Sequence, residues 1–194
     1  MSESQTIQTI ELHQIIPDCI KGDRSAQSRL YQLFAPTMFG VCLRYCRTRE
    51  EAEEVLQEGF LKVFEHLHQF KNAGSFEGWV RKIMVNCALQ KYRTKAHLHA
   101  IVSIDTAPVE QIGNEDVLAQ LGNKELLAMV QQLPPAYRMV FNLYVFEGMK
   151  HREIAQLLGV SEGTSKSNLS DARVLLQKAV AKSLTINQEK LRCL

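Results

Sequence analysis

Apolar residues recur every three or four positions along most of the chain, which is the spacing of packed helices rather than of strands. In the first half, this pattern predicts helices over residues 24–45, 50–70 and 76–95, with Pro36 as the single proline between residues 19 and 92. A second run of apolar positions begins near Lys124 and leads into a helix predicted over residues 136–146. We therefore expect an all-α fold of two small helical bundles.

The ends of these predicted helices carry local signals. Residues 20–23, Ile-Lys-Gly-Asp, break the chain before the first helix, and the loop of residues 71–75, Lys-Asn-Ala-Gly-Ser, precedes the third. Four glutamates open the second helix, where carboxylates favour the positive end of the helix dipole. Pro134 and Pro135 start a helix of the second bundle, because proline is tolerated in the first turn.

The segment between the two bundles, residues 97–123, loses the helical spacing. Its charge is one-sided, because residues 100–123 contain no basic side chain. The acidic residues there are Asp105, Glu110, Glu115 and Asp116. We interpret this segment as an acidic linker.

Residues 151–164 read His-Arg-Glu-Ile-Ala-Gln-Leu-Leu-Gly-Val-Ser-Glu-Gly-Thr, which is the layout of a helix-turn-helix. Ala155 is small where the two helices cross, Gly159 lies at the tightest part of the turn, and Ser161 is placed to cap the second helix. Such a second helix enters the major groove of DNA. The residues expected to contact DNA are Arg152, Thr164, Lys166, Ser167, Asn168, Ser170, Arg173 and Lys178.

A helical hairpin without a ligand is the alternative for this segment, and it shares the apolar pattern. It has no need for Gly159, Ser161 and a polar helix face together, so DNA binding is favoured. Two residues depart from the usual motif. Ser165 stands where an aliphatic side chain is usually buried, and Asp171 places a negative charge beside the phosphates. We therefore expect weak DNA binding by this unit alone.

The predicted helix over residues 76–95 has five basic residues after Trp79 and no acidic one. Aromatic rings stack on exposed bases, amides read base edges and cations hold the backbone, so this mixture is typical of single-stranded nucleic-acid binding. A solvated basic face with Trp79 in the core is the alternative. The helix before it is amphipathic, and its polar side is either a protein-docking surface or a solvated face.

Composition narrows the classes of protein. The 194 residues are 45% hydrophobic and 23% charged, as in a globular protein, and the net charge of +2 requires any basic surface to be local. No apolar run has the roughly 18 residues of a membrane span, and residues 1–11 lack the apolar centre of an export signal. We expect a cytoplasmic protein.

The five cysteines, at positions 19, 42, 46, 87 and 193, show no CxxC spacing and are expected to be free thiols. A metal site or a thiol enzyme built on Cys42 and Cys46 is the alternative. It would need further ligands or a base, and only scattered histidines such as His97 and His99 are present. We expect no cofactor, no metal and no enzymatic activity.

Several blocks, in their order and spacing, resemble those of bacterial sigma factors of the extracytoplasmic-function (ECF) type. They are Lys-Gly-Asp at residues 21–23, Ala-Glu-Glu-Val-Leu-Gln-Glu-Gly-Phe at 52–60, Trp-Val-Arg-Lys-Ile-Met-Val-Asn at 79–86, and the segment from Leu133 through the helix-turn-helix to Arg173. The resemblance implies an N-terminal extension (1–19), sigma region 2 (20–96), the linker (97–123), sigma region 4 (124–183) and a tail (184–194).

The resemblance also implies partners and roles. One helix would dock on the clamp helices of the large subunit of core RNA polymerase through Glu54, Leu56, Gln57, Glu58, Phe60 and Leu61. Region 2 would melt promoter DNA and bind the minus-10 element, in which a flipped base is captured, through Lys71, Asn72, Ser75, Phe76, Trp79, Arg81, Lys82, Asn86, Gln90 and Arg93.

In the same family, region 4 reads the minus-35 element as duplex, the linker passes through the RNA channel of the polymerase, and an anti-sigma factor masks the binding faces. Asn168 and Asp171 stand where relatives often carry arginine, which implies fewer contacts or a different preferred sequence. The runner-up function is a free-standing helix-turn-helix regulator that binds its operator without polymerase, usually as a dimer.

Overall fold

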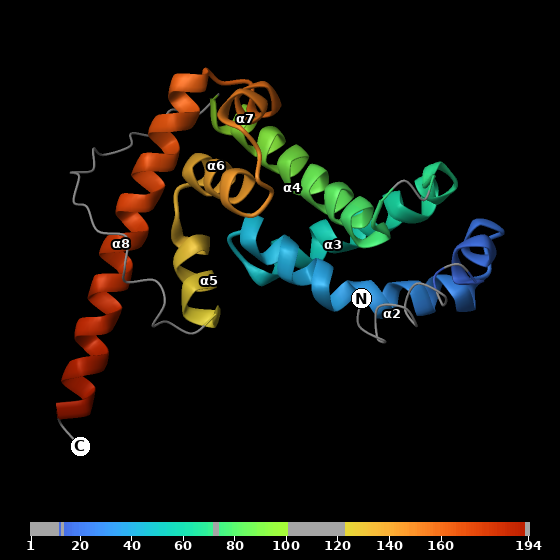
Figure 1. The fold of residues 1–194 in the computed structure, drawn as a ribbon, viewed down its shortest axis with the longest axis horizontal. Helices are drawn as coiled ribbons and strands as arrows, with labels where there is room; N and C mark the ends of the chain where they lie inside the picture. Colours follow the sequence, from blue (N-terminus) through green and yellow to red (C-terminus); the bar gives the residue numbers. More distant parts are fainter. Residues whose placement is uncertain (1–11, 13, 72–73, 101–122, 193–194) are drawn as a thin grey trace. The chain divides into compact units, whose positions relative to one another are not determined.

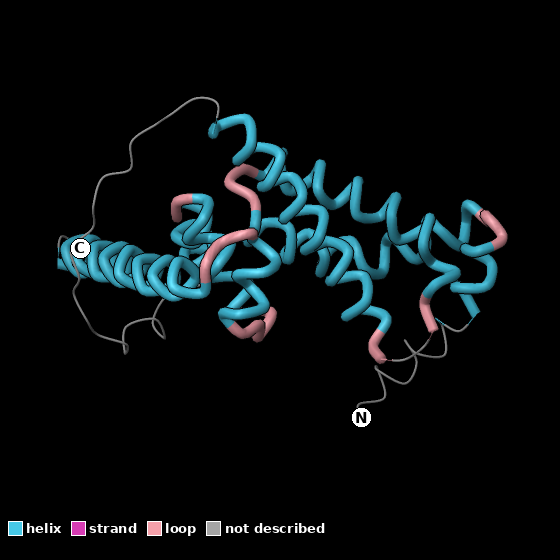
Figure 2. Tube along the Cα trace, turned by 90° about the horizontal axis from the view of Figure 1, so that it is seen from above, coloured by secondary structure: helices cyan, strands magenta, loops and turns pink. Residues whose placement is uncertain are grey.

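The computed structural model describes residues 12, 14–71, 74–100 and 123–192. Every regular element among these residues is a helix, which confirms the all-α prediction (Figure 2). The chain divides into two compact units, Met1–Gln90 and Lys91–Leu194. Most of the predicted linker, residues 101–122, lies outside the described residues.

The first unit contains α2 (Arg24–Tyr45), α3 (Arg49–His66), the short 3-10 helix η1 (Leu67–Gln69) and the start of α4 (Phe76–Ala100), after a helical stretch over residues 14–20. Capping side chains stabilise the first turns of α2 and α3. Asp23 accepts a hydrogen bond from the Ala26 N–H at 2.8 Å, and Thr48 accepts one from the Glu51 N–H at 3.2 Å.

The core of the first unit is formed by the apolar stripes of α2, α3 and α4. Its fully buried side chains include Leu30, Met38, Val55, Val63, Val80 and Met84. Gly59 of α3 leaves room for the buried side chain of Met84 of α4, since a Cβ at position 59 would overlap Met84 Sδ. α4 runs past the predicted end at residue 95 because neither glycine nor proline occurs between Lys95 and Ala100.

The second unit contains α5 (Asn123–Gln132), α6 (Pro135–Val145), α7 (His151–Leu158) and α8 (Glu162–Arg192), and the first three pack along α8 (Figure 1). Val130, Leu133, Ala172 and Leu176 form one buried cluster between α5 and α8. The helix α8 continues through most of the segment 184–194 that was expected to be a tail, because no glycine or proline follows Gly163.

A buried arginine joins two helices of the second unit. Arg138 of α6 is only 5% exposed, and its guanidinium donates hydrogen bonds to the carbonyls of Gln131 at 2.7 Å and Leu133 at 3.2 Å. Carbonyls at a helix C-terminus have no partner within the helix. The guanidinium therefore satisfies carbonyls at the end of α5 and links that end to α6.

Candidate functional site

An aromatic cluster supports the loop before α4. The rings of Phe70, Phe76 and Trp79 lie 5.0 to 5.7 Å apart between centroids, and Phe34 packs against Phe76 at 5.2 Å. Ser75 caps α4 by accepting a hydrogen bond from the Gly78 N–H at 3.3 Å. The cluster holds the ends of a loop in which Asn72 lies outside the described residues.

Phe76 was expected to contact the minus-10 element, and its position in the structure contradicts this expectation. Its side chain is only 6% exposed, because the first turn of α4 directs the ring into the aromatic cluster. It therefore supports the loop and offers no contact surface. Trp79 is half-buried against the same cluster, so it lies neither fully in the core nor fully in solvent. Lys71 and Ser75 are exposed on either side of the loop.

Polar side chains form a stripe along α4 that starts beside the aromatic cluster. The spacing of three and four residues places them on one face of the helix, and each is exposed. We call this set the α4 stripe: Lys82, Asn86, Gln90 and Arg93. Arg81, in contrast, is half-buried and engaged in other interactions.

The outward side of α3 combines acidic, amide and apolar groups, which we call the α3 face: Glu54, Gln57, Glu58 and Leu61. Leu61 is 71% exposed in the midst of polar neighbours. Leu56 and Phe60 were also expected at this surface, and this expectation is wrong. They are 6% and 3% exposed, because helical periodicity turns them toward the core, where Phe60 packs on Tyr31 at 4.6 Å.

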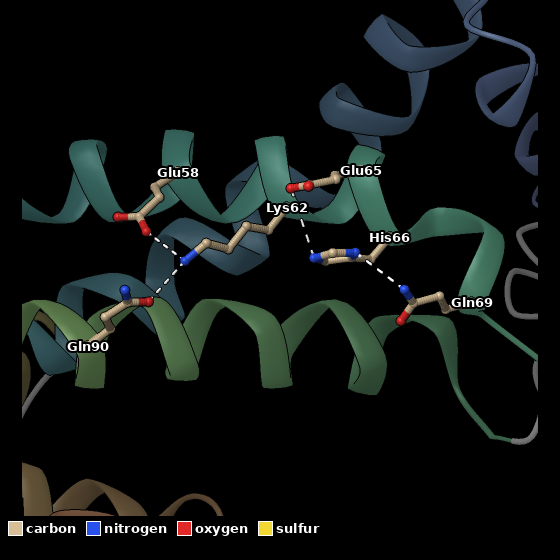
Figure 3. Close-up of polar contacts among 6 residues, drawn as sticks. All are labelled: Glu58, Lys62, Glu65, His66, Gln69 and Gln90. Carbon is tan, nitrogen blue, oxygen red and sulfur yellow. Dashed lines mark hydrogen bonds and ion pairs between the residues drawn. The ribbon is translucent and has the colours of Figure 1, made fainter.

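Lys62 connects the α3 face to the α4 stripe (Figure 3). Its ammonium donates hydrogen bonds to Glu58 Oε1 at 2.7 Å and to Gln90 Oε1 at 3.1 Å. The hydrogen bond with Glu58 raises the pKa of Lys62, so the lysine is firmly charged. The i, i+4 spacing of Glu58 and Lys62 signals the first contact in the sequence. Nothing in the sequence signals the second, which spans 28 positions.

Further along α3, His66 links its neighbours at the end of the helix (Figure 3). Its Nε2 lies 3.9 Å from Glu65 Oε2, and its Nδ1 lies 3.4 Å from Gln69 Nε2. All three side chains are at least partly exposed. These contacts tie the C-terminus of α3 to the 3-10 helix that leads into the loop.

The helix-turn-helix forms as predicted from α7 and α8. Gly159 adopts φ 70°, in the left-handed region that favours glycine, and Val160 N–H bonds the Ala155 carbonyl at 3.1 Å. Ser161 Oγ accepts a hydrogen bond from Thr164 N–H at 2.9 Å, which confirms its role as the cap of α8. Ile154 and Ala155 are buried at the helix crossing.

The expected DNA-contacting residues of this unit lie mainly on the surface. Asn168 is half-buried, and the exposed ones are Arg152, Thr164, Lys166, Ser167, Ser170, Arg173 and Lys178. Lys166 pairs with Glu162 at 2.9 Å and lowers the pKa of that carboxyl. The pair is exposed, so water competes with it and phosphate can replace the carboxylate.

The structure explains both residues that depart from the usual motif. Ser165 is fully buried, and a hydrogen bond joins its Oγ to His151 Nδ1 at 3.0 Å. Asp171 is half-buried and hydrogen-bonds the hydroxyl of Tyr137, whose pKa is raised by burial and then by this carboxylate. The negative charge of Asp171 is therefore engaged with α6.

The described thiols have the properties of core side chains. Cys19, Cys42, Cys46 and Cys87 are free and buried. Burial raises the pKa of Cys42 to about 12, with the neighbouring thiols Cys46 and Cys87 adding to the effect. Among the residues that the structure describes, no group of three or more metal-ligating side chains occurs. The helices of this part of the chain are each too short or too polar to span a bilayer. Cys193 and the side chains of His97 and His99 lie outside that part of the chain.

Two family models match successive parts of the chain. Sigma-70 region 2 matches residues 30–97, and Sigma-70, region 4 matches residues 123–176. The chain belongs to the sigma-70 family, in its ECF branch. The two matches coincide with the segments that carry the α4 stripe and the helix-turn-helix.

Relatives of this sigma-70 family chain include two sigma factors. The ECF RNA polymerase sigma factor SigE of Mycolicibacterium smegmatis is 29% identical over 83% of the chain, and the probable RNA polymerase sigma factor RfaY of Xanthomonas campestris is 27% identical over 86%. The chain spans 65% and 43% of their respective lengths. The solved sigma factor RpoE of Bartonella quintana, in complex with the anti-sigma factor NepR, has a TM-score of 0.49 at 18% identity and covers 79% of this chain and 96% of its own.

Proposed function

We propose that this chain is an alternative sigma factor, which binds core RNA polymerase and directs it to promoters. The observation that carries the proposal is the presence of both sigma regions in one chain, each with an exposed polar face. A free-standing helix-turn-helix regulator needs only the second region. That alternative assigns no binding role to the α3 face or the α4 stripe, so it is not favoured.

In the proposed mechanism, the α3 face docks on the clamp helices of the large polymerase subunit. Glu58 and its neighbours on this face supply charge and amide groups, and Leu61 supplies an exposed apolar side chain. Leu56 and Phe60 hold the face in place from the core beneath. An apolar contact surrounded by polar groups is the usual anatomy of a protein interface.

The α4 stripe is proposed to bind the minus-10 element as it melts. Lys82 and Arg93 attract the backbone, while the amides of Asn86 and Gln90 hydrogen-bond base edges. The loop of residues 71–75 would receive a flipped base, with Trp79 at its border. Flipping costs a few kcal/mol of unstacking, which these contacts must offset.

Region 4 is proposed to read the minus-35 element as duplex. The first turns of α8 would enter the major groove, where Thr164 and Lys166 meet base edges and phosphates. Arg152, Arg173 and Lys178 would add phosphate contacts. The half-buried Asn168 takes a place where relatives often have arginine, so fewer charged contacts are expected.

The proposal has further parts that concern partners and location. The acidic linker would occupy the RNA channel of the polymerase, and an anti-sigma factor would mask the binding faces when the signal is absent. Because core polymerase works in the cytoplasm, the chain is proposed to act there. The chain itself performs no bond chemistry in this mechanism.

A mobility-shift experiment with and without core polymerase separates the two candidate functions. Labelled genomic promoter fragments are incubated with the purified chain, with core polymerase, or with both. The sigma-factor proposal predicts a sequence-specific shift only when both are present. An equally specific shift by the chain alone would favour the free-standing regulator.

A further inference from the structure

His151, the first residue of α7, contacts the helices on both sides of it. Its Nδ1 lies 3.0 Å from Ser165 Oγ of α8, and its ring stacks on Tyr144 of α6 at 4.7 Å between centroids and 24° between planes. The His151 side chain thus links α6, α7 and α8, the three helices around the helix-turn-helix.

The contact with Ser165 differs in kind from the one that helix-turn-helix motifs usually make. Ser165 has no exposed surface, and it lies between Thr164 and Lys166, both of which face solvent. An aliphatic side chain would pack without a preferred direction. A hydrogen bond instead restricts both distance and angle, and a serine hydroxyl can donate to the neutral imidazole nitrogen.

Tyr144 extends these contacts back to α8. The guanidinium of Arg173 lies over the Tyr144 ring, 5.9 Å from its centroid. Contacts therefore lead from Arg173 through Tyr144 and His151 to Ser165. Ser165 and Arg173 are eight residues apart on one helix, which is about 12 Å at 1.5 Å per residue. A helix held at two such points is restrained in both position and rotation.

We propose that His151 is a positioning residue for promoter reading, which holds α8 at the angle that brings Thr164 and Lys166 to the minus-35 bases. The inference deepens the proposed function and rests on it. His151 acts through Ser165 and Tyr144. The buried hydrogen bond provides a directional contact in place of the aliphatic one, and it accounts for a serine at that position.

Three variants test this role. His151→Phe keeps a flat ring for Tyr144 but removes the nitrogen, Ser165→Val removes the hydroxyl, and the double variant restores an apolar pair. Gln156→Ala, an exposed change on the same helix, is the matched control. Holoenzyme affinity is measured for a promoter that the chain selects and for the same promoter with its minus-35 bases replaced. The ratio of the two affinities is the discrimination.

We expect each single variant to lower the discrimination about tenfold, which corresponds to about 1.4 kcal/mol. The double variant should regain the melting temperature but not the discrimination, and the control should match the wild type. Full discrimination in the double variant, or in both single variants, would overturn the proposal.

A second measurement needs neither promoter nor polymerase. A double-mutant cycle on thermal unfolding of the full chain should show coupling between His151 and Ser165. Absence of coupling would overturn the inference even if promoter selection is normal. If the wild-type holoenzyme selects no promoter, the proposed function fails, and the cycle still decides whether the contact exists.

Discussion

At the scale of single residues, different side chains of the α4 stripe are proposed to read bases and to hold the DNA backbone. The amide of Asn86 both donates and accepts hydrogen bonds, whereas Lys82 is a point charge. Both are exposed, so neither substitution should disturb the core. Their effects on promoter use should therefore differ in kind.

Asn86→Ala should reduce open-complex formation at some promoters far more than at others. The reason is that an amide contact depends on the base it meets. Fluorescence of a 2-aminopurine base in the minus-10 element measures the melting, and affinity for core polymerase should be nearly unchanged. Lys82→Ala is the control, and it should weaken all promoters similarly. Equal loss at every promoter for Asn86→Ala would contradict base reading.

Lys166→Ala should weaken binding of the minus-35 element and lower its salt slope by about one. The ammonium is held at 2.9 Å by Glu162 in the free chain, and a phosphate would replace that partner. Glu162→Gln is the matched variant, since it frees Lys166 and should strengthen binding slightly. Titrations of each variant holoenzyme with promoter DNA at several salt concentrations measure the affinity and the salt slope. An unchanged slope in Lys166→Ala would remove this phosphate contact.

The buried thiols should resist alkylation in the folded chain. The thiolate is the reactive form, and burial raises the pKa of Cys42 to about 12 and that of Cys19 to about 11. A Cys193→Ser variant is treated with iodoacetamide at pH 8 and followed by mass spectrometry. We expect slow labelling in buffer and fast labelling in urea. Fast labelling in buffer would contradict the burial.

At the scale of elements, Lys62 stabilises the pairing of α3 with α4. Lys62→Met removes two hydrogen bonds, and the loss of unfolding free energy should stay below about 1 kcal/mol because the side chain is partly exposed. The pKa of Lys62 is raised above its ordinary value of 10.5. The stabilisation is therefore fully present below that pH and is lost as pH rises through the folded pKa.

Urea unfolding of the wild type and Lys62→Met at pH 8 and above pH 10.5 checks this expectation. The difference in unfolding free energy between the two proteins should be present at pH 8 and become smaller at the higher pH. Arg49→Met, which breaks an exposed pair with Glu53 in the first turn of α3, is the control, because arginine keeps its charge throughout. A gap for Lys62→Met that is equal at both pH values would contradict the role of the ammonium.

Local sequence signals predicted the elements better than the site. The bounds of α2 and the Ser161 cap follow from residues close in the chain. The helical spacing of Leu56 and Phe60 places both on the apolar stripe of their helix, in agreement with their burial. The resemblance to the family placed them at the docking surface with Leu61, since a family block identifies a segment and not which of its faces is turned inward.

Contacts between distant residues were beyond the sequence pattern. The sequence identified Ser165 as a departure from the usual motif. It did not identify His151, 14 residues away, as the partner of Ser165. The same holds for Lys62 and Gln90, which are 28 positions apart and meet because α3 and α4 pack in the same unit. Such contacts depend on the packing of whole helices, which single positions do not reveal.

At the scale of the whole molecule, two units carry separate polar faces on a chain whose net charge is only +2. Exposed basic side chains on α4 and α8 nevertheless supply local positive charge: Lys82, Arg93, Lys166, Arg173 and Lys178. Non-specific attraction to DNA should be weak for the free chain. Binding of both promoter elements at once would raise the effective affinity. In the proposed function, the polymerase would provide that link.

Transcription start mapping tests the central claim most directly. The purified chain is combined with core RNA polymerase on a supercoiled genomic promoter library, and the 5′ ends of the transcripts are sequenced. The account predicts a small set of start sites that share minus-10 and minus-35 elements and disappear when the chain is omitted. Transcripts identical with and without the chain would contradict it.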